Sequence, residues 1–374
     1  MISFYGTTGS GLEATAAQEV STLGADITRM TKGKVFFLCS SSSCPDLIKL
    51  KTFERLFLEV LCAFHEEMEI SSIDKLLEEM KAVNWESNLK KWKNCRESAE
   101  SSPLSFRVSC KVTGQMRKKF SAFHVSKAVS ASIQNSTNYA VNLKQPCFEV
   151  NVRISDEYIT IGIPLTTEPL SKRPYLKHIS VRSTICHTMC LKAGISSGMR
   201  ILDPCCGHGT ILAEASYNWP ACIYFGLDQD LEALKIASEN MQSCKASTAS
   251  LICGDCARMP LTSESVDAIL CDPPFGIKHN CQETDKFLDR FLRECSRVLC
   301  EGGTMVVLLG GPLRSSFEMQ LETGQGEGED PGDRRENLRD FPHLVLKETL
   351  PLRLGLLDAI LWCLSKHSGR GHVT

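Results

Sequence analysis

The pattern of apolar and polar positions divides the chain into two halves of different character. In the first half, residues 11–24 carry apolar side chains at helical spacing and end in a glycine, which predicts a helix. Residues 33–38 form an apolar run that predicts a strand. Residues 47–95 predict helices that are interrupted around residues 69–72.

A clearer α/β pattern follows the polar segment 97–103, which we expect to be a linker. Residues 106–113 predict a strand, and residues 121–136 predict a helix that opens at a serine. The alternating runs 147–154 and 158–163 predict two strands of a hairpin. These elements form one compact α/β module.

The pattern changes after residue 164, where short unbroken apolar strands alternate with helices. Strands of this kind indicate a mostly parallel sheet that helices cover on both faces. The predicted strands are 199–203, 221–228, 249–255, 266–272 and 303–310, with later candidates at 344–350 and 358–364. The Gly-rich, charged stretch 322–336 predicts a flexible loop.

Charge is distributed unevenly along a chain whose overall balance is ordinary. Hydrophobic residues make up 43% and charged residues 23% of 374 residues, and the net charge is −2. Residues 105–177, however, carry eleven Lys and Arg against four Asp and Glu. A basic middle is typical of a surface that binds a phosphate backbone, although a solvated face with scattered lysines fits the charge equally well. The candidate RNA-binding residues are Arg117, Lys118, Lys119, Lys127, Arg173 and Lys177.

The nineteen cysteines are irregularly spaced in a chain too long for a disulfide scaffold. The N-terminal residues lack the basic and apolar segments of a secretory signal, and no apolar run is long enough to cross a membrane. We therefore expect reduced, mostly buried thiols in a protein of the nucleus or the cytoplasm.

Acidic residues end successive strands of the second half, at the edge of a parallel sheet where ligands bind. Asp203 ends the first of these strands, and Gly207 and Gly209 follow it. Asp228 lies 19 residues beyond Gly209, at the spacing of an acid that accepts ribose hydroxyls. Because the loop opens with an acid and lacks the dinucleotide glycine pattern, it suits a cationic cofactor without phosphates. S-adenosylmethionine fits that description.

Two further positions complete this cofactor prediction. Asp255 and its neighbour Cys256 follow the third strand, where we expect the adenine of the cofactor. A generic α/β loop with capping acids would explain Asp203 alone, but the alignment of several acids at strand ends favours a cofactor site.

The segment "DPPFG" at residues 272–276 carries the predicted chemistry. An exocyclic amine on a planar ring is a poor nucleophile, because the ring delocalises its lone pair. The Asp272 carboxylate and the Pro273 carbonyl can accept its two N–H bonds and hold it in line with a methyl donor. Pro274 stiffens the turn, and Phe275 can stack on the base. The alternative is a purely structural role, as a proline-rich turn with a buried aromatic ring.

Three other motifs resemble a redox, a phosphate-binding and a metal site, but we predict none of these functions for them. Cys253 and Cys256 have redox spacing, but no thioredoxin-like unit surrounds them. The glycines at residues 6–11 resemble a phosphate loop without its Lys and Ser/Thr pair. His187 lies beside two cysteines on a predicted helix but lacks a second pair of ligands, so we predict no metal site.

The order of these motifs resembles the THUMP-domain guanosine-N2 RNA methyltransferases. The likeness rests on "GLE…GKVFF", "SKRPYLKH…VRSTICHTM", "DPCCGHGT" and "DPPFG". It implies a ferredoxin-like segment with the start of the THUMP region at 1–100, a THUMP domain at 101–166, a linker at 167–180, and a Rossmann-like methyltransferase domain with a mostly parallel seven-stranded sheet at 181–374.

The resemblance also implies partners and a substrate. These are a structured RNA, either tRNA or spliceosomal small nuclear RNA, and a small zinc-binding activator subunit. Two alternatives stay open at this point. The motif could serve another exocyclic amine, adenine N6 or glutamine, or the chain could be an RNA-binding protein with an inert catalytic half.

Overall fold

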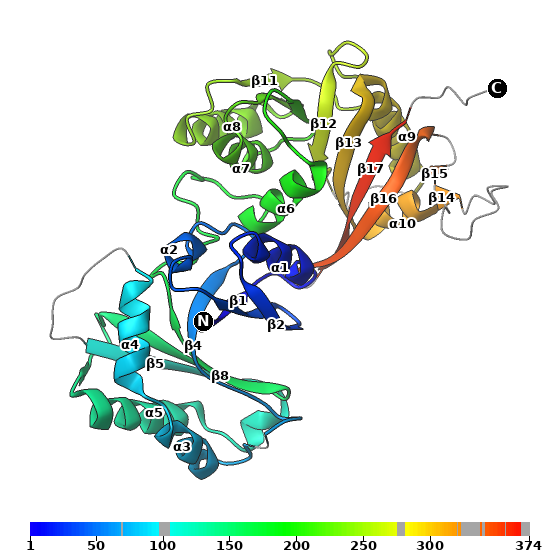
Figure 1. Cartoon of the computed structure of the whole chain (residues 1–374). Helices are drawn as coiled ribbons and strands as arrows, with labels where there is room; N and C mark the ends of the chain where they lie inside the picture. Colours follow the sequence, from blue (N-terminus) through cyan, green and yellow to red (C-terminus); the bar gives the residue numbers. More distant parts are fainter. Residues whose placement is uncertain are drawn as a thin grey trace. The chain divides into compact units, whose positions relative to one another are not determined.

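The computed structural model describes residues 1–68, 70–96, 105–274, 281–319, 321–322, 337–338, 341–355 and 357–367. The chain forms two compact units (Figure 1). The N-terminal unit comprises Met1–Thr8 and Glu13–Leu170, and the C-terminal unit comprises Gly9–Leu12 and Ser171–Thr374. No helix among the described residues is long and apolar enough to span a lipid bilayer.

The N-terminal unit is built on one mixed sheet, whose strand order is β2-β3-β1-β4-β8-β7-β5-β6. The β5 pairings with β7 and β6 are parallel and the others are antiparallel. The strands are β1 (Ile2–Thr7), β2 (Asp26–Thr31), β3 (Lys34–Cys39), β4 (Arg55–Phe64), β5 (Ser105–Val112), β6 (Ala140–Val141), β7 (Phe148–Ile154) and β8 (Tyr158–Pro164).

The helices of this unit all contribute to one apolar core on the sheet. They are α1 (Glu13–Ser21), α2 (Cys44–Leu47), α3 (Ile73–Lys81), α4 (Trp85–Asn94) and α5 (Ala122–Thr137), with a 3₁₀ turn, η1 (Gly114–Lys118), after β5. Helices α3 and α5 lie side by side under the sheet in Figure 1. Each presents an apolar stripe inward, as Val125, Val129 and Ile133 do on α5.

One prediction for this unit is wrong. Residues 47–95 were expected to be helical, but β4 occupies Arg55–Phe64 within that range. The strand pairs with β1 on one side and β8 on the other, so both of its edges are hydrogen-bonded and it lies in the middle of the sheet. A continuous apolar run has no period that separates a central strand from a buried helix, and tertiary pairing decides between them. Strands β1 and β2 also lie outside the predicted elements.

The C-terminal unit contains the predicted doubly covered sheet. Its strand order is β11-β10-β9-β12-β13-β17-β16-β15-β14, nine strands among the described residues. The strands are β9 (Arg200–Asp203), β10 (Ile223–Asp228), β11 (Ala249–Cys253), β12 (Val266–Cys271), β13 (Leu299–Gly310), β14 (Leu321–Glu322), β15 (Asn337–Leu338), β16 (Phe341–Leu354) and β17 (Leu357–Lys366).

The strand directions confirm a mostly parallel sheet. Strands β11, β10, β9, β12 and β13 pair in parallel. Strand β17 runs against β13, and β16 runs against β17, so β16 has the common direction again. These are the seven predicted strands, and the two-residue strands β15 and β14 extend the sheet beyond them.

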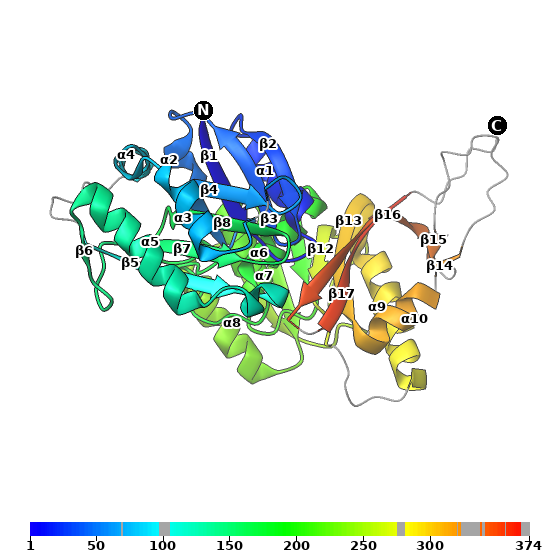
Figure 2. The same cartoon turned by 90° about the horizontal axis from the view of Figure 1, so that it is seen from below.

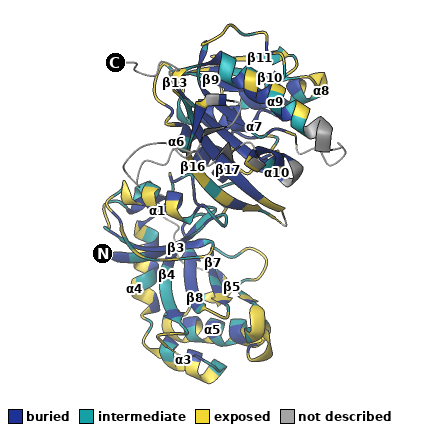
Figure 3. Ribbon diagram, turned by 90° about the vertical axis from the view of Figure 1, so that its right-hand side faces the viewer, coloured by how far each residue is buried: buried dark blue, intermediate teal, exposed yellow. Residues whose placement is uncertain are grey.

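Helices cover both faces of this sheet and form two separate cores. Helices α6 (Ser183–Ala193), α7 (Thr210–Asn218) and α8 (Leu231–Ser243) contribute to one core. Helices α9 (Cys281–Val298) and α10 (Gly311–Met319) contribute to the other, and Figure 2 shows them together beside β13 and β17. In Figure 3 the middle strands are mainly buried, whereas α8 has an exposed outer side.

Two predicted loops fall outside the described residues. They are the polar linker 97–103 and the Gly-rich loop 322–336, of which only Glu322 is described. The domain boundaries proposed from the sequence stay predictions.

Candidate active site at the strand ends of the C-terminal unit

The loop between β9 and α7 is shaped by its glycines and tied to the neighbouring strand. Gly207 and Gly209 have φ angles of +49° and +70°, a region that L side chains rarely adopt. A Cβ on Gly209 would lie 3.0 Å from the Cβ of Ala237, so this position also lacks room for a side chain. The Gly207 N–H donates to Asp228 Oδ2 at 2.8 Å. The loop therefore keeps a fixed place beside the end of β10.

Asp203 ends β9 as a nearly inaccessible carboxyl group, 1% exposed. Its Oδ1 accepts the N–H of Cys205 at 3.2 Å. Burial raises the pKa of Asp203 well above its usual range, and the negative charges of Asp272 and Asp228 raise it further. The structure thus brings together three of the acids that the sequence singled out. None of the described residues forms an ion pair with Asp203.

Asp272 directly follows β12 and has no polar partner for one buried oxygen. Its Oδ1 is buried and accepts no hydrogen bond from any described residue. Burial raises the pKa of Asp272 to about 7. Pro273 beside it is buried and Pro274 is exposed. Phe275, predicted to stack on a base, lies outside the described residues.

Asp255 stands apart from the other acids and is exposed. Its Oδ1 accepts the N–H of Ala257 at 2.8 Å, which fixes a turn after β11. The neighbouring Cys256 is half-buried and packs with Cys205, the first residue after the β9 turn. Cys256 therefore links the β11 loop to the loop after β9. Cys206, the next residue after Cys205, is buried in the core that α6, α7 and α8 share.

The fully buried Asn240 of α8 connects the cofactor loop to the basic segment before α6. Its Nδ2 donates to the carbonyls of His178 and His208, both at 2.8 Å. Its Oδ1 accepts the N–H groups of Lys177 and His178 at 2.9 and 3.1 Å. Both amide ends are thereby satisfied. No sequence pattern had marked Asn240, because a single polar residue on an amphipathic helix is ordinarily exposed.

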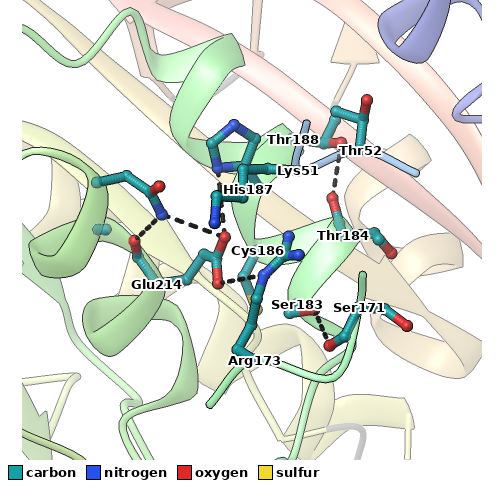
Figure 4. Close-up of polar contacts among 12 residues, drawn as sticks. Lys51, Thr52, Ser171, Arg173, Ser183, Thr184, Cys186, His187, Thr188 and Glu214 are labelled. Atoms are coloured by element: carbon teal, nitrogen blue, oxygen red, sulfur yellow. Dashed lines mark hydrogen bonds and ion pairs between the residues drawn. The ribbon is translucent and has the colours of Figure 1, made fainter. Parts of the chain in front are cut away.

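A second buried connection centres on Glu214 of α7 and corrects the prediction for Arg173. Arg173 is 3% exposed, and its Nε lies 3.2 Å from Glu214 Oε2 (Figure 4). It is therefore an internal partner of a carboxylate and not a surface group for phosphates. Tyr175 donates to the same oxygen at 2.8 Å, and its ring stacks on Tyr217.

His187 also faces Glu214, with its Nδ1 3.3 Å from Oε1. Burial alone would raise the pKa of Glu214, but His187, Arg173 and Tyr175 together hold it below its usual value. The helix α6 is packed on nearly every side, as expected for a structural helix. No group of three His, Cys, Asp or Glu residues in the described part of the chain is arranged to hold a metal ion.

The other predicted RNA-binding residues are exposed. Arg117 and Lys118 lie in η1, Lys119 follows it, and Lys127 lies on α5, all in the N-terminal unit. Lys177 is exposed in the segment that Asn240 holds. Exposure is necessary for contact with a phosphate backbone, and their role as RNA ligands stays a prediction.

Three family models match successive parts of the chain. The RlmL ferredoxin-like domain matches residues 3–52, the THUMP domain matches 71–163, and the RMKL-like methyltransferase domain matches 171–320. The matched order agrees with the order of domains expected from the sequence.

Sequence relatives carry related names. The U6 snRNA (guanine-N(2))-methyltransferase THUMPD2 of Bos taurus is 36% identical over 239 residues, 61% of this chain and 46% of the relative. The human THUMPD2 is 37% identical over 207 residues, which are 55% of this chain and 41% of the relative. The tRNA (guanine(6)-N2)-methyltransferase of Thermus thermophilus is 29% identical over 209 residues, which are 54% of this chain and 62% of the relative. The chain spans less than half the length of the THUMPD2 relatives.

Solved structures confirm the fold. TrmN from Thermus thermophilus superimposes with a TM-score of 0.73 at 23% identity, over 98% of this chain and 100% of TrmN. SMU.472, complexed with SAH, gives a TM-score of 0.73 at 15% identity, over 99% of both chains. The predicted resemblance and fold class are therefore confirmed: successive parts of this chain match the RlmL ferredoxin-like, THUMP and RMKL-like methyltransferase domains.

Proposed function

We propose that the chain transfers a methyl group from S-adenosylmethionine to the N2 amine of a guanosine in a structured RNA. The observation that carries the proposal is the buried, unpartnered Asp272 oxygen beside Asp203 in a methyltransferase domain. The names of the relatives, which act on U6 snRNA or tRNA, favour guanosine N2 as the acceptor.

S-adenosylmethionine is the cofactor of this domain, and the residues at the strand ends fit it. A Cβ on Gly207 would meet no atom within 4 Å, so the loop borders open space. Asp203 offers a buried carboxyl group whose ionised form a bound cation would stabilise and a phosphate would not. Asp228 already accepts the N–H groups of Gly207 and Asp230, yet a carboxylate retains further lone pairs for ribose hydroxyls. We assign Asp203, Gly207, Gly209, Asp228, Asp255 and Cys256 to cofactor binding.

Asp272 is suited to hold an exocyclic amine. An ionised carboxylate can accept hydrogen bonds but cannot donate them. The buried Oδ1 of Asp272 has no donor among the described residues. An N–H of the guanosine amine would supply that donor, and the Pro273 carbonyl would accept the second N–H. Methyl transfer forms an N–C bond and breaks an S–C bond, and the amine loses one proton. Asp272, Pro273, Pro274 and Phe275 are the proposed catalytic motif, in which Phe275 would stack on the base.

The basic residues of the N-terminal unit would hold the RNA. Arg117, Lys118, Lys119 and Lys127 are exposed cations in or near the part that matches the THUMP domain. Lys177 would contact RNA near the catalytic unit. Their contacts would be to phosphates, which position a substrate without reading its sequence. Relatives named for U6 snRNA and for tRNA leave both RNA classes as candidate substrates.

We further infer that a small zinc-binding activator subunit joins the chain, as the family resemblance implies. Exposed apolar side chains on the C-terminal unit, such as Leu231 and Leu357, are candidates for its interface. We propose that the protein acts in the nucleus or the cytoplasm, where RNAs of these classes would be its substrates.

The reaction is tested by incubating the full chain and the activator with labelled S-adenosylmethionine and unmodified U6 snRNA or tRNA transcripts. We expect labelled N2-methylguanosine after digestion to nucleosides. Because Asp272 must be ionised to accept the amine, the rate should rise with pH to about 7 and then level off. Asp272→Ala should lower the rate at least about a hundredfold.

The same assay separates the alternatives. Label recovered in N6-methyladenosine would show that the acceptor is adenine N6 and not guanosine N2. Label that survives nuclease treatment would show that the acceptor is a protein. A chain that binds RNA but shows no cofactor binding by calorimetry would be an inert RNA-binding protein. Full activity of Asp272→Ala would contradict the assigned motif.

A second prediction concerns stability. Burial raises the pKa of Asp272 to about 7, so the folded protein resists its ionisation. The resulting destabilisation is absent below about pH 4, grows as the pH rises, and is complete above about pH 7. Asp272→Asn should therefore stabilise the free protein at pH 8 relative to pH 4, by up to about 4 kcal/mol. Denaturant unfolding at pH 8 and pH 4 measures the difference, and equal effects at both values would refute the ionisation argument.

A third prediction concerns the activator. Co-expression with the activator should give a one-to-one complex on size exclusion and raise methyl transfer by about tenfold or more. Leu231→Glu and Leu357→Glu, made singly, test the two apolar positions, with Leu143→Glu on the N-terminal unit as the matched exposed control. Equal activity with and without the activator would remove this part of the proposal.

A further inference from the structure

The two faces of the N-terminal sheet differ in what covers them. Phe4 of β1 and Phe37 of β3 point into the core that all five helices share. Their chain neighbours Tyr5 and Phe36 belong to a separate aromatic cluster, together with Phe57, in which no described helix residue takes part. Since successive side chains on a strand point to opposite faces, this second cluster marks a helix-free face of the sheet.

The strand register aligns basic side chains on this helix-free face. Lys111 of β5 lies opposite Arg153 of β7, and Arg153 lies opposite Thr160 of β8. Paired residues on adjacent strands share a face. Val112 and Ile154, the chain neighbours of the two cations, are buried in the helical core, which confirms that Lys111 and Arg153 point the other way.

Lys111 and Arg153 are exposed and form no ion pair with any described residue. A third cation lies beneath them: Lys34 is only 6% exposed, and its Nζ donates to Thr160 Oγ1 at 3.0 Å. The ammonium also sits 4.3 Å from the ring centroid of Tyr158. Burial, helped by the positive charge of Arg153, lowers the pKa of Lys34 to about 7. Lys34 is therefore only partly protonated at neutral pH, and the positive charge of the row comes mainly from Lys111 and Arg153.

Most acidic groups near this row are protonated more easily than usual or already paired, but Glu157, next to Tyr158, is exposed and forms no ion pair with a described residue. Burial raises the pKa of Glu59 to about 7 despite the opposing effect of Lys34. Glu149 pairs with Arg107. At the edges of the face, Glu66 and Glu67 pair with Arg29, and Asp156 accepts two backbone N–H groups of η1. A polyanion would meet little repulsion across the middle of the sheet.

Aromatic rings and further cations border the same row. Tyr158 and Phe64 are half-buried and contact each other edge to face, 5.7 Å between ring centroids. The segment Gly114–Lys118 follows β5 closely and carries Arg117 and Lys118. Cations that follow a backbone, with rings beside them, are the recurring features of surfaces that bind single-stranded nucleic acid.

We propose that the helix-free face of the N-terminal sheet binds a single-stranded stretch of the substrate RNA, with Lys111 and Arg153 on phosphates and Tyr158 against a base. This inference rests on the proposed function and extends the contact surface from Arg117–Lys119 across β5 and β7. The face offers charge and rings but few groups that could read base edges, so binding there should tolerate different sequences.

The test measures binding of the full chain to a fluorescent 12-nucleotide RNA of mixed sequence and to an unmodified tRNA transcript, at several salt concentrations. The double variant Lys111→Ala, Arg153→Ala should lower affinity for the oligonucleotide by about tenfold or more. It should also reduce the slope of log affinity against log salt by about 1.4, roughly 0.7 for each lost phosphate contact.

Matched variants separate this role from folding and from general charge. Lys75→Ala with Lys81→Ala removes the same charge from α3, where both lysines are exposed, and should leave affinity and slope unchanged. Tyr158→Leu should weaken binding at least about fivefold, whereas Tyr158→Phe keeps the ring and should bind as wild type.

A double variant that matches the α3 control in affinity and slope would overturn the proposal. An acidic protein partner would be indicated instead if RNA binding were unchanged while a polyglutamate peptide lost its affinity for the double variant. Because binding is measured without turnover, a failure of methyl transfer would count against the proposed reaction and leave this result standing.

Discussion

Burial of carboxyl groups without a cationic partner is the constraint on which the C-terminal unit depends. Asp203 and Asp272 lie at the ends of adjacent strands, and neither has a cationic partner among the described residues. Such groups lower stability, and folded proteins keep them chiefly where chemistry requires them. A cationic cofactor and an amine donor would provide the missing partners. The parallel sheet makes the arrangement possible, because it brings the carboxyl ends of β9 and β12 to one edge.

The same unit contains a buried acid with the opposite behaviour. Glu214 has Arg173, Tyr175 and His187 around its carboxylate, and its pKa is lowered although it is fully buried. It joins α6, α7 and the segment before them into one rigid support. Asn240 adds a second connection, from α8 to the loop that follows β9. Buried polar groups that have partners, such as Glu214 and Asn240, thus connect the helices and loops. The acids without partners lie where ligands would bind.

The sequence predicted the C-terminal unit better than the N-terminal one, for physical reasons. Parallel strands such as 199–203 and 266–272 are short, apolar and followed or ended by acids, so each strand and its acidic end show in one local pattern. Strand β4 has no such mark, because its apolar run shows no clear alternation and its pairing with β1 and β8 is long-range.

Individual polar residues were harder to predict than strands. Arg173 looked like a surface cation because its partner Glu214 is 41 residues away in the chain. Glu214 itself could have been suspected, since it is an isolated acid within an apolar helix. Asn240 gave no signal, and the basic row of Lys111 and Arg153 becomes visible only when strand register places the two side by side.

The central claim is that the buried acids Asp203 and Asp272 favour the binding of a cationic ligand. Calorimetry tests this claim most directly. S-adenosylmethionine carries a sulfonium charge that its product, S-adenosylhomocysteine, lacks. Titrations of both into the free chain between pH 5.5 and pH 8.5, with Asp203→Asn as the comparison, measure the effect of that charge. The account predicts that the preference for S-adenosylmethionine grows as the pH rises through about 7 and that Asp203→Asn reduces it. A preference that is independent of pH and unchanged in Asp203→Asn would contradict it.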